Sequence, residues 1–212
     1  MSSIQEIILL VPILLISLSF HELAHGLVSY KLGDPTPKVQ GRLTLNPLAH
    51  LDLVGSLVLI VTRRIGWAKP VPINPRYYKN PRKGMMLVGL AGPGANIGLA
   101  IIFSLIIKSV VYFLNTFSPL SGSLGGNFIY LMVMFFKMAI LINISLAVFN
   151  LLPIPPLDGS KILRGILPPK YDRYFLKLEG PVGMIVLLLL AYTGILWGVI
   201  SPIVNIFFNI LV

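Results

Sequence analysis

Long apolar stretches, separated by short polar loops, make up most of the chain. Four of them are long enough for a helix that crosses a bilayer, at residues 4–31, 84–113, 127–152 and 181–200. Pro202 interrupts the last stretch, and the apolar tail at 203–212 is about half as long as a span. The pattern predicts a membrane all-α fold: a polytopic helical bundle of about four full spans, with short or partial apolar helices.

One segment after the first predicted helix has a different period. Residues 38–46 alternate apolar and polar positions, which is typical of a strand or hairpin. A strand edge cannot face lipid, so it must lie at the interface or in a protein-lined or watery cavity. The apolar run after Asp52 is short for a span. We therefore expect 38–62 to form a β-hairpin or re-entrant element, with a short tilted membrane helix at 48–62 as the alternative.

The composition fits a membrane protein. Of 212 residues, 56% are hydrophobic and 11% are charged, whereas soluble domains carry about 25% charged residues. No long polar stretch offers a separate soluble domain, so residues 1–212 are predicted to form a single domain. The chain has no cysteine, which excludes disulfides and thiolate chemistry and leaves His, Asp and Glu as the expected metal ligands.

The positive charges are unevenly placed. Seven of the 17 Lys and Arg residues lie in 63–83 and five in 161–177, while 114–126 has none. This bias predicts that both basic loops are cytoplasmic and that 114–126 lies outside. Attraction to anionic lipid headgroups accounts for the net charge of +10, so we expect the lipid bilayer and not nucleic acid as the partner.

The sequence His21-Glu22-Leu23-Ala24-His25 lies inside the first apolar stretch. Two histidines four residues apart share one face of a helix, where both can bind one Zn²⁺ with Glu22 beside it as general base. Ionisable side chains in a membrane helix are costly and need a reason. The alternative is a pair of satisfied core histidines on a packing face. The motif lies toward the cytoplasmic end of its helix, which predicts an active site facing that side.

A catalytic zinc needs a third protein ligand. The few acids outside the motif are Glu6, Asp34, Asp52, Asp158, Asp172 and Glu179. The helix at 127–152 runs inward and delivers Asp158 to the depth of the motif, past prolines that free the backbone. The alternative for Asp158 is a helix cap. His50 and Asp52 are a rival ligand set, a second shell or an interfacial pair, and we favour a second-shell or structural role.

Other polar residues are candidates for holding substrate. Asn150 could supply an amide N–H to the oxyanion or to the substrate backbone. Asn96, a lone amide in a membrane helix, needs a polar partner and belongs to the same group of candidates. Leu43 and Thr44 lie on the predicted strand, whose edge could pair with an unwound substrate; a surface ribbon that merely packs on the bundle is the alternative. For the glycines nearby, at 89, 92, 94 and 98, we favour close helix packing, since Gly94 and Gly98 form a G-x-x-x-G pair.

Two segments together closely resemble the site-2 protease family of intramembrane zinc metalloproteases. They are the H-E-x-x-H segment and Asn150-Leu151-Leu152-Pro153-Ile154-Pro155-Pro156-Leu157-Asp158-Gly159, similar to the family's N-x-x-P-x-P-x-x-L-D-G signature. Two further segments are similar to elements of this family. The glycine- and asparagine-bearing motif that precedes the second signature in the family resembles Gly92-Pro93-Gly94-Ala95-Asn96. The strand-and-loop element of compact bacterial and archaeal members looks like Gly41 through Gly55.

The resemblance covers roughly residues 20–160. It implies that His21, His25 and Asp158 bind one Zn²⁺, that Glu22 is catalytic and that Asn150 helps to hold substrate. It also implies a multi-pass protein of a prokaryotic plasma membrane, of the compact form without a PDZ or CBS domain. The expected substrate is a membrane protein with a transmembrane helix, and the sequence leaves the oligomeric state open.

Two other functions compete with this interpretation. A CAAX-type membrane protease would take a late glutamate as third ligand, and the only one is Glu179, in a basic loop. A divalent-metal transporter or metal-binding scaffold would need acidic or histidine side chains along a path. Three histidines and seven acids provide one cluster and no such path.

Overall fold

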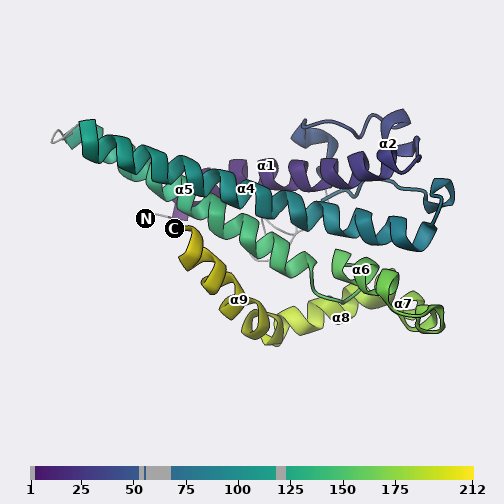
Figure 1. Ribbon diagram of the computed structural model, residues 1–212. Helices are drawn as coiled ribbons and strands as arrows, with labels where there is room; N and C mark the ends of the chain where they lie inside the picture. Colours follow the sequence, from purple (N-terminus) through teal and green to yellow (C-terminus); the bar gives the residue numbers. More distant parts are fainter. Residues whose placement is uncertain (1–2, 53–54, 56–67, 118–122) are drawn as a thin grey trace.

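The computed structural model describes residues 3–52, 55, 68–117 and 123–212 (Figure 1). Three long helices run side by side: α1 (Ser3–Lys31), α4 (Pro81–Phe117) and α5 (Ser123–Asn150). Helix α4 packs against both α1 and α5, and α5 runs back along α4. Each contains a segment long and apolar enough to cross a membrane, at Ile8–Lys31, Pro81–Leu114 and Phe128–Asn150. The first three predicted helices are thus confirmed.

The C-terminal third is built from shorter helices. They are α6 (Asp158–Ile166), η3 (Pro169–Tyr171), α7 (Asp172–Leu178), α8 (Pro181–Tyr192) and α9 (Ile195–Leu211). The segment Pro169–Leu178 meets α8 at a bend of 73°. If this bent pair counts as one span, the described residues contain four candidate spans instead of three. Helix α6 packs against α4, and α9 packs against α5.

The predicted fourth helix at 181–200 is divided, and the division is not at Pro202. Helix α8 ends at Tyr192, and Gly194 has a φ of +78°, a left-handed conformation that turns the chain. Pro202 lies inside α9, where it removes one backbone hydrogen bond without ending the helix. The predicted break at Pro202 is therefore wrong, because the glycine and not the proline changes the direction of the backbone.

The predicted strand at 38–46 is also wrong. Thr36–Val39 form a short helix, α2, and the backbone N–H of Thr36 donates to the Asp34 carboxylate at 2.9 Å. The chain then folds back, with the N–H of Arg42 donating to the carbonyl of Pro37. This hydrogen bond and a proline in the first turn of the helix outweigh a short alternation of apolar and polar residues.

No β-strand occurs among the described residues, and the only β feature there is an isolated antiparallel bridge between Leu51 and Ala68. Short 3₁₀ helices, η1 (Pro47–Ala49) and η2 (Pro75–Tyr77), flank this region. The choice between a re-entrant element and a tilted helix concerns 48–62, most of which lies outside the described residues.

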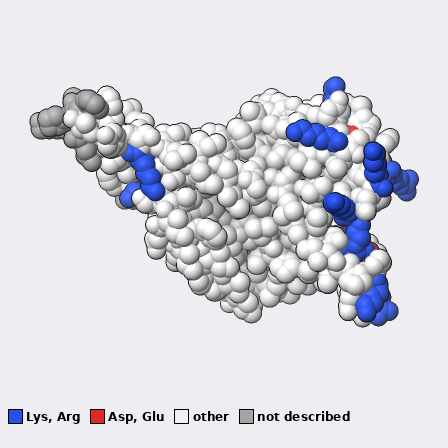
Figure 2. Space-filling view, in the orientation of Figure 1, with Lys and Arg blue, Asp and Glu red and all other residues white. Residues whose placement is uncertain are grey.

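An apolar core joins α4, α5, α8 and α9. Its buried members are Ala100, Ile107, Ile140, Ile144, Leu157, Leu187, Leu196, Ile200 and Val204. Many large apolar side chains on the outer faces of the same helices are exposed, as expected for surfaces that meet lipid. Figure 2 shows that most visible Lys and Arg side chains gather at one end of the molecule, where Figure 1 places α2 and α7.

Candidate metal centre

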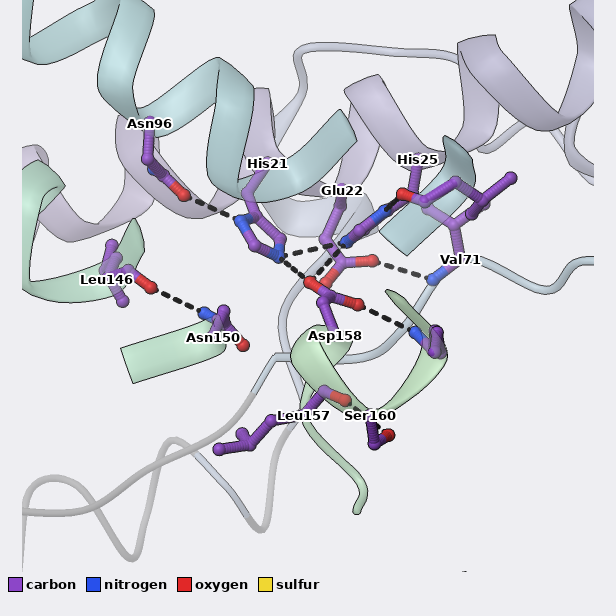
Figure 3. A network of polar contacts seen from close by, with 12 residues as sticks. His21, Glu22, His25, Val71, Asn96, Leu146, Asn150, Leu157, Asp158 and Ser160 are labelled. Carbon is purple, nitrogen blue, oxygen red and sulfur yellow. Dashed lines mark hydrogen bonds and ion pairs between the residues drawn. The ribbon is translucent and has the colours of Figure 1, made fainter. Parts of the chain in front are cut away.

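Three side chains from two elements meet between α1 and α6. His21 and His25 lie one turn apart on α1, and Asp158 is the first residue of α6 (Figure 3). The two histidine Nε2 atoms are 3.0 Å apart. Asp158 Oδ2 lies 3.2 Å from Nε2 of His21 and 3.0 Å from Nε2 of His25. All three side chains are buried. The sequence-predicted ligand set is thus brought together in space.

The hydrogen bonds around the histidines fix where their protons are. His21 Nδ1 lies 2.6 Å from Asn96 Oδ1, and His25 Nδ1 lies 2.6 Å from the carbonyl of Val88. Both partners are acceptors, so each Nδ1 carries the hydrogen when the ring is neutral. The Asn96 amide is oriented independently, because its Nδ2 donates to the Ser17 carbonyl and to Asn143 Oδ1. Each Nε2 therefore presents a lone pair to the other.

This arrangement has too many acceptors and no donor at its centre. Asp158 Oδ2 is buried and has no hydrogen-bond partner among the described residues. The ammonium group of Lys161 lies 2.8 Å from Asp158 Oδ1, and this positive charge favours the carboxylate form of Asp158. Ligand atoms on a tetrahedral zinc lie about 3.3 Å apart, close to the distances found here. The donor set fits Zn²⁺.

Gly92 of α4 lies directly over the two imidazole rings. A Cβ atom at this position would lie 2.4 Å from His25 Nε2 and 2.6 Å from His21 Nε2. Only glycine leaves room for the rings. The close packing predicted for the glycines of this segment is confirmed at Gly89 and Gly92. It is wrong for the Gly94–Gly98 pair, where a built Cβ meets no described atom within 4 Å outside the backbone of its own helix.

The carboxylate of Glu22 lies beside the three side chains (Figure 3). Its Oε2 accepts a hydrogen bond of 2.8 Å from the backbone N–H of Val71. Val71 stands between Pro70 and Pro72, neither of which has an N–H, so this segment has a single donor here and uses it on Glu22. The bond holds one carboxylate oxygen in place and leaves the other for chemistry.

A cavity of about 300 Å³ opens on the site. It is lined by His21, Glu22, His25, Ala68, Pro70, Val71, Ile73, Val88, Asn150, Pro156, Asp158, Lys161 and Met184. Asn150 is part of this lining, and its Nδ2 donates to the carbonyl of Leu146 one turn earlier. A cavity with apolar walls and a few convergent polar groups is typical of a substrate site.

Asn96 does not reach the cavity. It is fully buried and links His21 to α5 through Asn143, whose Nδ2 donates to Ser17 Oγ at 2.9 Å. The predicted need for a polar partner is confirmed, since that partner is the histidine itself. The network ties α1, α4 and α5 together behind the metal centre.

The cavity lining does not include the four candidate site residues in or just after the segment 38–46, namely Leu43, Thr44, His50 and Asp52. Leu43 packs on α1, where a Cβ at Gly26 would meet its Cδ2 at 2.7 Å. The carbonyl of Thr44 is 2.9 Å from His50 Nε2, and Asp52 accepts from the N–H of Gly55. These contacts shape the loop.

The rival third ligand, Glu179, pairs with Arg164. In the part of the chain that the structure describes, one group of His, Asp and Glu side chains can hold a metal ion, and it consists of His21, His25 and Asp158. The transporter alternative is therefore not favoured.

Sequence reasoning missed three contributors to the site: Val71, Asn143 and Lys161. Asn143 carried a usable signal, because it is another lone amide in a membrane helix and the argument applied to Asn96 applies to it. Val71 acts through its backbone, for which the sequence has no signal. Lys161 stands one helical turn after Asp158, and its Nζ is 2.8 Å from Asp158 Oδ1.

Comparison with known proteins agrees with this site. Residues 9–192 match the model of peptidase family M50. The chain is 41% identical to the putative zinc metalloprotease YwhC of Bacillus subtilis over 92% of this chain and 85% of that protein. It is 28% identical to the putative zinc metalloprotease Rip2 of Mycolicibacterium smegmatis over 82% of this chain and 62% of the relative, and 29% identical to Rip2 of Mycobacterium tuberculosis over 75% and 57%. No solved structure matches. The chain belongs to peptidase family M50, the site-2 protease family, and is an intramembrane zinc metalloprotease.

Proposed function

We propose that the H-E-x-x-H segment and Asp158 form the catalytic centre. In this proposal His21, His25 and Asp158 hold one Zn²⁺ per chain, and Glu22 is the general base. The observation that carries it is the meeting of three buried lone-pair atoms, two Nε2 and one Oδ2, with no hydrogen between them. Such a group is unfavourable alone and is stabilised by a cation.

The residues of the chain divide the work of peptide hydrolysis. Bound zinc would supply Lewis acidity and lower the pKa of a water toward ~7. Glu22, held by the Val71 N–H, takes the proton of the attacking water and passes it to the leaving amine. Asn150 lies in the cavity lining, where its amide is available to substrate. Asn96 and the Val88 carbonyl keep both imidazoles in the tautomer that binds metal.

The proposed substrate is a transmembrane segment of another membrane protein, cut within or near the bilayer. His21 lies ten residues before Lys31, the end of α1, so the site is about 15 Å from that end along the helix. A helical substrate must unwind to expose its carbonyls, and a cavity of about 300 Å³ accommodates an extended segment better than an intact helix. The whole chain, 1–212, acts as a single protease domain in this proposal.

The experiment that tests the catalytic assignment replaces Glu22 by glutamine. Glu22→Gln keeps the shape and the contact with the Val71 N–H but removes the base. We expect purified Glu22→Gln protein in lipid vesicles to cleave a model transmembrane substrate about 10²–10⁴-fold more slowly while retaining zinc. Cleavage at the wild-type rate with zinc retained would remove Glu22 from the mechanism.

We further propose that the protein lies in the cell membrane with its active site toward the cytoplasm. The support is the gathering of Lys and Arg at one end of the molecule. The chain has no native cysteine, so single cysteines can be labelled selectively. Lys79→Cys should react with a membrane-impermeant maleimide only after the cytoplasmic side is opened, and Thr116→Cys should react in intact cells. The reverse pattern would overturn this orientation.

A further inference from the structure

The metal-facing carboxylate of Asp158 uses its two oxygens differently. Oδ2 faces the histidine nitrogens, and Oδ1 accepts a hydrogen bond of 2.8 Å from Lys161 Nζ. Asp158 and Lys161 are three residues apart on α6, so they lie on one face of that helix. The Asp158 side chain is 5% exposed and the Lys161 side chain 30% exposed. The lysine thus covers the outer oxygen of a buried carboxylate.

The path of the Lys161 side chain is fixed at its base. A Cβ atom on Gly89 of α4 would lie 3.1 Å from Lys161 Cβ and 3.0 Å from the carbonyl of Asp158. The helices α4 and α6 are therefore in close contact where the lysine begins. From there the Lys161 side chain forms part of the lining of the 300 Å³ cavity, and its ammonium group donates to Asp158 Oδ1.

Neighbouring cations are not available to Asp158. Arg82 pairs with Asp172 at 3.1 Å and also donates to the carbonyl of Leu167. Arg164 pairs with Asp172 and with Glu179. Among the described residues, Lys161 is the one Lys or Arg in hydrogen-bond contact with the Asp158 carboxylate.

We propose that Lys161 is a positioning residue that holds Asp158 as a one-oxygen metal ligand. A free carboxylate can bind a cation through both oxygens, and the second oxygen would then occupy the open coordination position that a catalytic zinc needs. The ammonium group occupies Oδ1, keeps Oδ2 directed at the histidines and offsets the negative charge that the cavity gathers from Asp158 and Glu22. The proposal rests on the ligand set proposed above.

The test compares Lys161→Met, Lys161→Arg and Lys161→Ala with the wild type. Methionine retains much of the aliphatic stem and removes the charge, while arginine restores a cationic donor; the alanine variant repeats the test if the methionine variant does not fold. Lys177→Met, at an exposed lysine of α7, is the matched control. Zinc affinity is measured by chelator competition, and the coordination number is followed by the visible spectrum of the Co²⁺-substituted protein.

We expect Lys161→Met to bind zinc about 10–100-fold more weakly, as is usual when a partner of a metal ligand is removed, with Lys161→Arg closer to the wild type. The Co²⁺ spectrum should lose the intensity typical of four-coordinate sites in Lys161→Met and keep it in Lys177→Met. Wild-type affinity or an unchanged spectrum in Lys161→Met, or equal loss in the arginine variant, would overturn the proposal. Asp158→Ala, measured beside them, distinguishes failure of the Lys161 proposal from failure of the proposed ligand set. Full zinc retention in Asp158→Ala would overturn the ligand set itself.

Discussion

Two buried polar clusters each include residues of α1, and they differ in the balance of hydrogen-bond donors and acceptors. The metal centre gathers three lone-pair atoms of His21, His25 and Asp158 with no hydrogen between them. The second cluster, which we call the Asp34 cluster, consists of Ser29, Asp34, Thr36, Asn74 and Tyr78.

In the Asp34 cluster every close contact joins a donor to an acceptor. The carboxylate of Asp34 accepts the Ser29 hydroxyl at 2.8 Å, the Asn74 N–H at 2.7 Å and the Thr36 N–H at 2.9 Å. Because the Ser29 hydrogen points to Asp34, the Tyr78 hydroxyl donates to Ser29 Oγ at 2.7 Å. The cluster satisfies itself and ties the end of α1 to the segment before α4.

The comparison teaches that burial alone does not distinguish a functional polar cluster from a structural one. Asp34 is 0% exposed and Asp158 is 4% exposed, so both carboxylates are equally hidden. The balance of donors and acceptors separates them. A self-satisfied cluster needs nothing more, whereas a cluster of facing lone pairs is completed only by a cation.

The largest expected effect comes from filling the space above the metal centre. Gly92→Ala places a methyl group within 2.6 Å of both histidine Nε2 atoms, so the rings must move apart. We expect zinc binding to be lost and cleavage of a transmembrane substrate to fall about 100-fold or more. Zinc analysis and a cleavage assay on the same purified sample measure both effects.

Gly94→Ala is the matched control, since a Cβ there meets no described atom within 4 Å outside the backbone of its own helix. It makes the same chemical change two residues away in the same helix. Equal loss of zinc in both variants would show that helix geometry, and not the space above the rings, limits the site.

The second effect concerns the network behind His21. Asn96→Leu removes the acceptor for His21 Nδ1 and leaves Asn143 without one of its donors. We expect zinc affinity to fall about 10–100-fold, because partners of metal-ligating histidines fix the tautomer and orientation of the ring. Asn96→Asp keeps the acceptor and should retain more zinc affinity than Asn96→Leu; the opposite order, by chelator competition, would contradict the orientation role.

A smaller effect is expected in the Asp34 cluster. Tyr78→Phe removes one hydroxyl and leaves Ser29 Oγ without its donor, at a buried position. The free energy of unfolding should fall by about 1 kcal/mol. Zinc content should stay at the wild-type level, because nothing in this cluster contacts the metal centre. Loss of zinc in thermally stable Tyr78→Phe protein would show that the two clusters are coupled.

The smallest effect is a dependence on pH. Burial would raise the pKa of Asp34, but hydrogen bonds from Thr36, Asn74 and Ser29 outweigh it and hold the pKa below its usual value of 3.8. The unfolded chain therefore binds this proton more readily, so the contribution of Asp34 to stability is full above about pH 4 and is lost as the pH falls through the folded-state pKa. The gap in Tm between wild type and Asp34→Asn, measured without zinc, should narrow below pH 4. A gap that is constant with pH would contradict this sign.

The metal centre could be predicted from the sequence because its determinants are local. His21 and His25 are one helical turn apart by spacing alone, and the prolines before Asp158 mark an irregular backbone at membrane depth. The long apolar helices were predictable for the same reason, since each depends on a continuous run of residues.

The features that the sequence did not predict depend on competition between signals or on contacts across the fold. Residues 38–46 do alternate, but the Asp34 carboxylate accepts the Thr36 N–H and a proline stands in the first turn, so a short helix begins at Thr36 instead. The contact between Val71 and Glu22 is made by a backbone N–H, which any non-proline residue possesses. The role of Gly92 depends on the packing of α4 against the histidines of α1, and the spacing of residues in the sequence does not reveal that packing.

The measurement that tests the central claim most directly is the zinc content of the wild-type chain beside that of Asp158→Ala, both purified in detergent and dialysed against zinc-free buffer. The account predicts about one zinc per wild-type chain and almost none in the variant, because two histidines alone give an incomplete site. Equal zinc content in the two proteins would contradict the claim that His21, His25 and Asp158 together form the metal centre.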